Sequence, residues 1–248
     1  MEVIYGINPL KEVLIGGGEG VTRIVIARGR TEAGITEIRN LAKQQGIPVE
    51  IRERAFLDNL TGHVSHQGVL GVCRAYQYQD LDAVIANRHP ACLYDLVLIL
   101  DGIMDPHNLG AIIRTAHCFG VNGIILPENR SASVTATVIK TSAGAARYLP
   151  VARVTNIARA LDELKTRGFW IFGADAHATQ SLSAPDYQGA VGLVMGGEGK
   201  GMRPLTRKKC DFLISIPMLG KIDSLNVSVS AGIIMHEIRR KTTSAIRI

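Results

Sequence analysis

Beyond residue 95, five short apolar segments alternate with helical patterns. The apolar segments are residues 96–100, 123–126, 169–172, 193–195 and 212–216. Uninterrupted apolar runs of this length are typical of parallel strands that helices cover on both faces of a sheet. The helical patterns lie at about 108–119, 132–143, 156–167 and 226–240. We therefore expect this part of the chain to form an α/β fold with an open, parallel sheet.

Residues 1–76 show a smaller α/β pattern. Its expected elements are strands at 21–27, 47–51 and 69–75 and a helix at 34–45. Strand periodicity is then lost, and residues 77–95 carry polar side chains, Pro90 and apolar positions for only one short helix. We therefore predict a domain at 1–76, a linker at 77–95 and a second domain at 96–248.

The composition argues against several classes of protein. The 248 residues contain 28 Lys and Arg against 22 Asp and Glu, and the resulting charge of +6 suits a polyanionic partner without requiring one. No apolar run approaches the roughly 20 residues that cross a bilayer, and residues 1–6 resemble no targeting leader. We therefore expect a cytoplasmic protein with no membrane association. The four cysteines form no Cys-x-x-Cys pair, which argues against a disulfide scaffold and a structural zinc site.

Common nucleotide-binding and catalytic motifs are missing from the sequence. No Gly-x-Gly-x-x-Gly follows the segment at 96–100, and there is no Gly-x-Ser-x-Gly. Gly199 and Lys200 do not form a phosphate-binding loop, since Gly201 stands where Ser or Thr is required. His63 and His66 could ligate a metal only with two further ligands, and surface histidines are the simpler interpretation. We expect no metal site.

Three segments, each following a predicted strand, combine backbone-permissive residues with isolated polar side chains. In the first, Asn108 stands at an expected helix start and Arg114 lies about two turns along the same helix. Asn108 is either a helix cap or a functional amide. Arg114 interrupts an apolar pattern, where a stable charge needs a partner, so a structural salt bridge and an anionic ligand are both open.

The second and third segments hold their polar groups in loops. Residues 192–202 place four glycines around Glu198, and glycines let a ligand approach the backbone because they carry no Cβ. Residues 214–226 lead into the last predicted helix and contain Ser224 and Asn226. The structural alternatives are a plain turn for Glu198 and an N-cap for Ser224 or Asn226.

Together and in this order, the three segments resemble the signature of the SpoU, or TrmH, branch of the SPOUT RNA 2′-O-ribose methyltransferases. That signature consists of Asn-x-Gly-x-x-x-Arg, Gly-x-Glu-Gly, and Ile-Pro-Met followed by Ser-Leu-Asn-Val-Ser-x-Ala. The resemblance covers residues 96–240. Residues 6–14 and 66–69 resemble the start and the end of the L30e-like RNA-binding domain of family members that act on ribosomal RNA.

The resemblance implies a SPOUT-type parallel sheet with a C-terminal trefoil knot, a small N-terminal L30e-like α/β domain and a homodimer that completes the active site. It also implies S-adenosyl-L-methionine as the cofactor. The residues at the family's cofactor-binding positions are Gly196, Gly197, Ile216, Met218 and Leu225. Those at its catalytic positions are Asn108, Arg114, Glu198, Ser224 and Asn226.

The resemblance also implies a substrate. The most similar family members methylate the ribose 2′-hydroxyl of a guanosine in the P loop of 23S rRNA, within the peptidyl-transferase centre, so the implied partner is 23S rRNA or a precursor of the large subunit. A tRNA ribose methyltransferase of the same superfamily is one alternative, although such enzymes usually carry helical extensions instead of an α/β module. A non-catalytic RNA-binding assembly factor is the other, and it should have lost Arg114, Glu198 or Asn226, which are all present.

Overall fold

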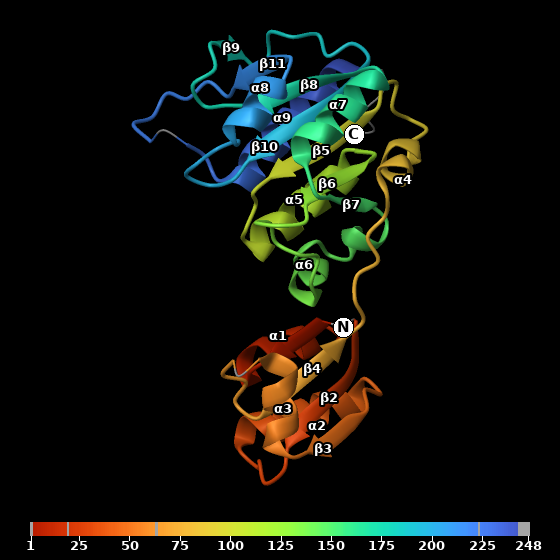
Figure 1. Ribbon diagram of the computed structural model, residues 1–248, viewed down its shortest axis with the longest axis vertical. Coiled ribbons are helices and arrows are strands. Elements are labelled where there is room, and N and C mark those ends of the chain that lie inside the picture. Colours follow the sequence, from red (N-terminus) through yellow and green to blue (C-terminus); the bar gives the residue numbers. More distant parts are fainter. Residues whose placement is uncertain (1, 19, 63, 223, 243–248) are drawn as a thin grey trace. The chain divides into compact units, whose positions relative to one another are not determined.

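The chain folds into two compact units (Figure 1). The structure, a computed structural model, describes residues 2–18, 20–62, 64–222 and 224–242. The first unit comprises Met1–Gln77 with Thr135–Lys140, and the second comprises Tyr78–Val134 with Thr141–Ile248. Helix α4 (Leu81–Ala86) lies in the second unit, within the stretch expected to be a linker.

The first unit is built on a four-stranded sheet with the strand order β1-β4-β2-β3. Its elements are β1 (Glu2–Tyr5), α1 (Ile7–Ile15), β2 (Val21–Ala27), α2 (Ala33–Gln44), β3 (Val49–Arg52), α3 (Arg54–Thr61) and β4 (Val69–Cys73). The three predicted strands and the predicted helix are confirmed, whereas the sequence patterns do not indicate β1, α1 or α3. Strand β1 is short, and α1 carries Pro9 in its first turn, where a missing N–H breaks no helical hydrogen bond.

Both faces of this sheet are covered. Ile24 and Ile26 of β2 are buried in one apolar cluster with Leu10 of α1. Val25, between them, is buried in a second cluster with Leu57 of α3. Because successive side chains of a strand point to opposite faces, the double covering explains why this part of β2 is apolar at every position.

The two N-terminal segments that carry the resemblance lie side by side in this unit. The Gly6 N–H donates to the carbonyl oxygen of Val69 at 3.3 Å. The Ile7 N–H donates to Oε1 of Gln67 at 2.9 Å, and Gln67 has a φ of 51°. The start of α1 is therefore fixed against the turn that precedes β4.

His66 has a structural place in the same turn. Its ring is buried, with Nε2 2.8 Å from Oδ1 of Asp58, and Nδ1 accepts a hydrogen bond from the Gly68 N–H at 3.0 Å. The expectation of a surface histidine is therefore wrong for His66, while His63 lies outside the described residues. Within the described parts of the chain, no three His, Cys, Asp or Glu residues are grouped so that they could hold a metal ion.

The second unit contains a seven-stranded sheet with the order β7-β6-β5-β10-β8-β11-β9, and all of its strand pairs are parallel. The strands are β5 (Leu96–Asp101), β6 (Gly123–Pro127), β7 (Val151–Val154), β8 (Phe169–Ala174), β9 (Gln180–Ser181), β10 (Ala190–Gly196) and β11 (Phe212–Ser215). All five predicted strands are confirmed, and the parallel α/β sheet with them. Strands β7 and β9 are short and lie at the two edges, which explains why no long apolar run marks them.

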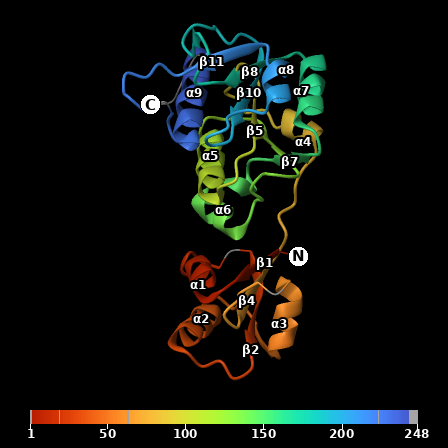
Figure 2. The same cartoon turned by 60° about the vertical axis from the view of Figure 1, so that its left-hand side comes forward.

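Helices cover both faces of this sheet (Figure 2). They are α4, α5 (Pro106–Cys118), α7 (Ile157–Thr166), α8 (Pro204–Lys209) and α9 (Val227–Thr242), and the second unit also contains the 3-10 turn at Ala145–Arg147. All but the last residue of the short α6 (Ala136–Thr141) belongs to the first unit. Val97 and Ile99 of β5 are buried in a cluster with Leu161 of α7. Helices α5 and α9 pack against each other on the opposite face. None of the described helices is long and apolar enough to cross a membrane.

Candidate functional site

The three polar segments begin at the carboxyl-terminal side of the large sheet. Strands β5, β10, β8 and β11 are neighbours and run parallel, so their carboxyl ends lie together. Asn108 follows β5, Glu198 follows β10, and the segment with Ser224 and Asn226 follows β11. Loops at the carboxyl ends of parallel strands are the usual place for a binding site in an α/β sheet.

Asn108 is held at the start of α5 with its side chain free for other contacts. Asp105, not Asn108, caps the helix, because its carboxylate accepts from the His107 N–H at 3.0 Å and the Asn108 N–H at 3.3 Å. The cap interpretation of Asn108 is therefore wrong. Asp105 followed by Pro106 is a recognisable helix-start pattern that could have identified the true cap.

Asn108, Glu198 and Asn226 form a hydrogen-bonded cluster. Nδ2 of Asn108 donates to Oε1 of Glu198 at 2.6 Å. Nδ2 of Asn226 donates to Oδ1 of Asn108 at 3.0 Å and also lies 3.4 Å from Oε1 of Glu198. One carboxylate oxygen therefore receives two amide donors. The start of α5, the glycine loop and the start of α9, which are far apart in the sequence, are tied together through these side chains.

Asn226 also caps the last helix. Its Oδ1 accepts from the N–H groups of Ser228 and Val229 at 2.9 and 3.3 Å. The N-cap interpretation is therefore confirmed for Asn226, and the other atom of its amide, Nδ2, stays available for the contact with Asn108. Ser224 is exposed and makes no hydrogen bond through its side chain to the described residues, so the N-cap alternative is wrong for Ser224.

Arg114 lies on the exposed side of α5. Its guanidinium forms no ion pair with any residue that the structure describes, so the salt-bridge alternative finds no support among these residues. The neighbouring Ile112 and Ile113 are buried, which means that the apolar pattern belongs to the other side of the helix. A guanidinium on the solvent-facing side of the helix is available to an anion.

The glycines around Glu198 are required by the loop itself. A Cβ on Gly196 would come within 2.3 Å of the Met202 backbone nitrogen, and one on Gly197 within 2.4 Å of the Gly102 carbonyl oxygen. Gly199 and Gly201 have φ values of 76° and 63°. The expectation that these glycines open the backbone to a ligand is therefore incomplete, because close backbone packing and left-handed conformations already demand them.

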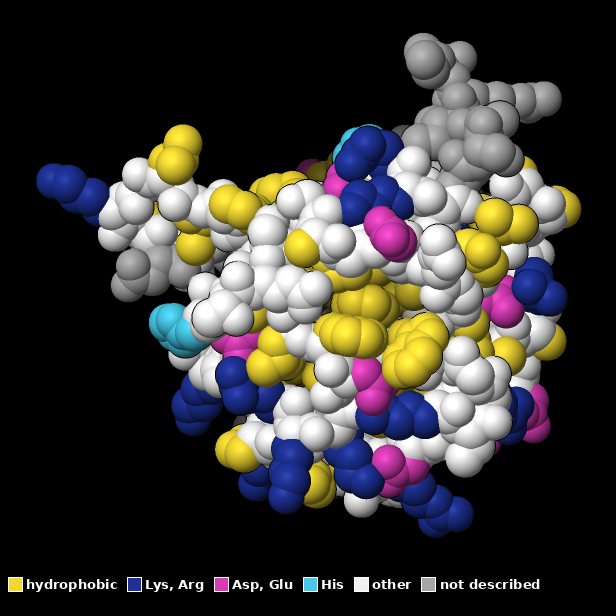
Figure 3. Space-filling model, turned by 90° about the horizontal axis from the view of Figure 1, so that it is seen from above, with side chains coloured by type: hydrophobic (Ala, Val, Ile, Leu, Met, Phe, Trp, Pro, Cys, Tyr) yellow, Lys and Arg dark blue, Asp and Glu magenta, His cyan; other side chains and the backbone are white. Residues whose placement is uncertain are grey.

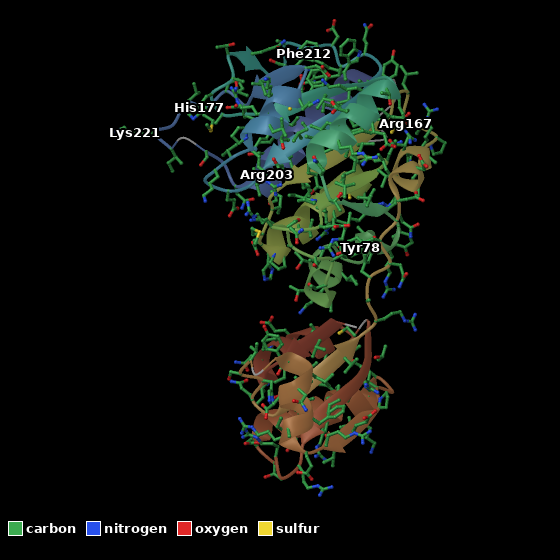
Figure 4. The ribbon with its side chains drawn as sticks, in the orientation of Figure 1. Tyr78, Arg167, His177, Arg203, Phe212 and Lys221 are labelled. Carbon is green, nitrogen blue, oxygen red and sulfur yellow. The ribbon has the colours of Figure 1, made fainter. Side chains whose placement is uncertain are left out.

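The segment after β11 exposes apolar side chains. Ile216 is half-buried, whereas Met218, Leu219, Ile222 and Leu225 are exposed. The segment projects from the sheet edge, with Lys221 far out on it (Figure 4), and hydrophobic side chains are visible along the projection in Figure 3. Such side chains gain free energy when a ligand or another chain covers them.

Three basic residues that follow the glycine loop form ion pairs with acidic residues of the second unit. They are Arg203, Arg207 and Lys209. Arg207 lies 2.6 Å from Asp175 and Lys209 2.7 Å from Asp162. Burial alone would raise the pKa of Asp175, but hydrogen bonds from Arg207 and from the His177 backbone hold that pKa below its usual range. This cluster is therefore mainly a set of structural ion pairs.

Helices α5 and α9 present a shallow groove of about 550 Å³. It is lined by Ala111, Thr115, Phe119, Ser228, Val229, Gly232, Ile233 and His236. Most of these side chains are small or apolar, and Val229 and Ile233 are exposed in it. Next to the groove, buried Arg239 of α9 donates to the carbonyl oxygens of Tyr94, Phe119 and Gly120.

Comparison with known proteins assigns the family. Residues 95–236 match the model of the SpoU rRNA Methylase family. The chain belongs to this family. Residues 3–79 match the model for RNA 2′-O ribose methyltransferase substrate binding. A member of the SpoU family with this pairing of domains is an RNA 2′-O-methyltransferase.

Individual relatives extend over nearly the whole chain. A Bacillus subtilis protein named as a TrmH family tRNA/rRNA methyltransferase, YacO, is 44% identical over 97% of this chain and 96% of its own length. The 23S rRNA (guanosine-2′-O-)-methyltransferase RlmB of Xanthomonas campestris is 42% identical over 98% of this chain and 97% of its own length. The SpoU methyltransferase AviRb of Streptomyces viridochromogenes, crystallised with AdoMet, shares the fold, with a TM-score of 0.62, 24% identity and coverage of 96% and 89%.

Proposed function

We propose that this protein transfers a methyl group from S-adenosylmethionine to the ribose 2′-hydroxyl of a guanosine in the P loop of 23S rRNA. The observation that carries the proposal is the cluster of Asn108, Glu198 and Asn226, which joins all three signature segments at one sheet edge. Arg114 is exposed on the same helix as Asn108 and forms no ion pair with the described residues, so it adds a cation for an RNA phosphate.

S-Adenosylmethionine is the methyl donor of the SpoU family, and the residues at this edge fit such a molecule. Ile216, Met218 and Leu225 supply apolar surface for an adenosine and a thioether chain, and Gly196 and Gly197 supply backbone beside it. We propose these five residues as the cofactor contacts. When bound, the cofactor supplies an electrophilic methyl group on a sulfonium. Because the thioether leaves as a neutral group, the protein's tasks are alignment, exclusion of water and removal of one proton.

Arg114 has the central role in the proposed chemistry. A guanidinium stays protonated in proteins, so Arg114 binds a phosphate and stabilises negative charge as it develops on the 2′-oxygen. Bound S-adenosylmethionine would supply the methyl group to that oxygen, and the hydroxyl proton would pass to water. Glu198 orients Asn108 through their hydrogen bond, and Ser224 and Asn226 position the ribose.

The proposal also includes a homodimer, a knot and a role for the first unit. We propose that the groove on α5 and α9 packs against the same groove of a second copy, since its small and apolar lining suits close helix packing. We further propose a trefoil knot in the segments that follow β10 and β11, and an L30e-like role in RNA binding for the first unit. The match of residues 3–79 to a substrate-binding model supports the last assignment.

The choice of ribosomal RNA rests on the RlmB relative, whose similarity extends over both units. A tRNA substrate is the alternative, because the YacO relative carries a name that includes tRNA. Both polymers offer the same ribose and phosphate chemistry to the cluster around Glu198. The first unit, as the substrate-binding part, would make the distinction.

One experiment tests enzyme, cofactor and substrate together. Purified protein and its Arg114→Ala and Arg114→Lys variants are incubated with radiolabelled S-adenosylmethionine and either 23S rRNA lacking ribose methylation or tRNA. We expect label at the P-loop guanosine, mapped by primer extension, and its loss in Arg114→Ala. Label on tRNA alone would contradict the proposal that 23S rRNA is the substrate. A pH step in activity near neutrality that moves in Arg114→Lys would contradict the assigned role of Arg114, because arginine and lysine side chains are both ordinarily cationic near neutral pH and should give the same profile there.

A further inference from the structure

Asp101 is a buried carboxylate that the proposed chemistry does not use. It is the last residue of β5, beside β10 in the middle of the large sheet, and its side chain is completely buried. An ionised carboxylate in such a position needs a compensating partner. The contacts of Asp101 therefore indicate what this buried carboxylate does in the fold.

Asp101 contacts both ends of the glycine loop. Its carbonyl oxygen accepts from the Gly197 N–H at 3.0 Å, where the loop begins. Its Oδ2 accepts from the Arg203 N–H at 2.9 Å, where the loop ends. The loop itself is closed by the Gly201 N–H, which donates to the Gly197 carbonyl at 2.9 Å.

Arg203 supplies the counter-charge. Its Nε lies 3.2 Å from Oδ1 of Asp101, at the sheet edge where β5 ends (Figure 4). The N–H is not directed at Oδ1, which accepts no hydrogen bond within the described part of the chain. Unlike Arg207 and Lys209, whose acidic partners are partly exposed, Arg203 pairs with a carboxylate that has no contact with water.

We propose that Asp101 and Arg203 form a clamp that positions the glycine loop for cofactor binding and places Glu198 against Asn108. Glu198 lies between the two clamped points. The residue after Asp101, Gly102, also packs its carbonyl against Gly197, and the same connection leads directly to Asn108. One buried carboxylate thus sets the separation of the two loops whose side chains meet at 2.6 Å. Asp101 and Arg203 are positioning residues, and their effect on the cofactor rests on the proposed function.

The test compares Arg203→Met, which keeps an apolar stem but loses the charge, with Arg207→Met. The control removes a similar half-exposed arginine from the pair with Asp175, four residues away. If the loop is correctly placed in only about a tenth of Arg203→Met molecules, the apparent Kd for S-adenosylmethionine rises about tenfold. Calorimetry without RNA measures this Kd, and hydrogen exchange of the Gly197 and Gly201 amides reports the loop directly. We expect Arg203→Met to change both and Arg207→Met to change neither.

A double variant separates positioning from stability. Arg203→Met leaves a buried charge unpaired and should lower the Tm, whereas Asp101→Asn combined with Arg203→Met removes that charge and should restore the Tm. We expect the Kd and the amide exchange to stay altered, because one neutral hydrogen bond then holds the loop.

Recovery of the Kd together with the Tm would overturn the clamp, and so would a raised KM for RNA with an unchanged Kd. If the wild-type protein bound no S-adenosylmethionine, the proposed function would fail, and the amide exchange alone would still decide whether the clamp exists.

Discussion

Nδ2 of Asn108 lies 2.6 Å from Oε1 of Glu198, although 90 positions separate the two residues in the chain. Asn108 is 9% exposed, and Glu198 is exposed. The carboxylate therefore faces solvent on one side and a largely buried amide on the other. A hydrogen bond to a charged group of this kind contributes about 1.5–3 kcal/mol.

Replacing Glu198 with Gln should reduce methyl transfer by at least about tenfold, since the charge-assisted hydrogen bond to Asn108 becomes a weaker neutral one. The Kd for S-adenosylmethionine should change little, because the loop backbone is retained. Single-turnover assays and calorimetry measure the two effects. Glu163→Gln, which weakens an exposed ion pair with Arg167, is the matched control and should leave both unchanged. Unaltered turnover in Glu198→Gln would remove Glu198 from the site.

Arg239 should be a major source of stability. Arg239 is 3% exposed, and its guanidinium donates to three carbonyl oxygens, two of them at the end of α5. Burial lowers the pKa of this group, yet a guanidinium with three acceptors remains charged. We expect Arg239→Met to reduce the free energy of unfolding by about 2–4 kcal/mol. Arg240→Met, which removes an exposed guanidinium from its pair with the half-buried Glu237, should cost less than about 1 kcal/mol in the same urea titration. Equal losses would contradict the assignment.

The groove on α5 and α9 predicts the oligomeric state. Ile233→Glu places a carboxylate in the apolar lining, so the proposed homodimer should dissociate at concentrations where the wild-type protein is dimeric. Sedimentation velocity measures the change, and methyl transfer should fall with it. Leu205→Glu, at an exposed position on α8, should leave the dimer intact. A monomeric wild-type protein, or a dimeric Ile233→Glu variant, would refute this interface.

The cysteines should differ in reactivity with pH. Burial raises the pKa of the Cys210 thiol to about 12, whereas Cys118 is exposed. Because the thiolate is the reactive form, iodoacetamide at pH 8 should alkylate Cys118 and spare Cys210 in the folded protein. The folded state holds the Cys210 proton more tightly than the unfolded chain, whose thiol has a pKa of about 8.5. The resulting contribution to the free energy of unfolding is complete below about pH 8.5 and is lost as the pH rises toward 12.

Mass spectrometry of the alkylated peptides checks this prediction. Protein unfolded in guanidinium chloride is the control, and there both cysteines should react at similar rates. Rapid labelling of Cys210 in the folded protein at pH 8 would show that the thiol is accessible and ionised.

The main strands and helices could be predicted from the sequence because their patterns are local. A run such as residues 96–100 is apolar at every position, and burial on both faces of a sheet requires that of a strand. Strands β1 and β7 could not be predicted, since their segments are neither apolar throughout nor strictly alternating, and they depend on pairing with β4 and β6. The helix cap at Asp105 was recoverable from its neighbour Pro106.

The residue types of the site were also evident from the sequence: an amide, a carboxylate and a second amide, each in a segment that follows a strand. Their mutual contacts were decided only by the tertiary structure. The strand order brings the ends of β5, β10 and β11 to one edge, and no local pattern encodes which side chains then meet. The exposure of Arg114, the two roles of Asn226 and the clamp between Asp101 and Arg203 all depend on contacts between residues distant in the chain. Such contacts form because burial and hydrogen bonding are satisfied by the whole fold, not by a single segment.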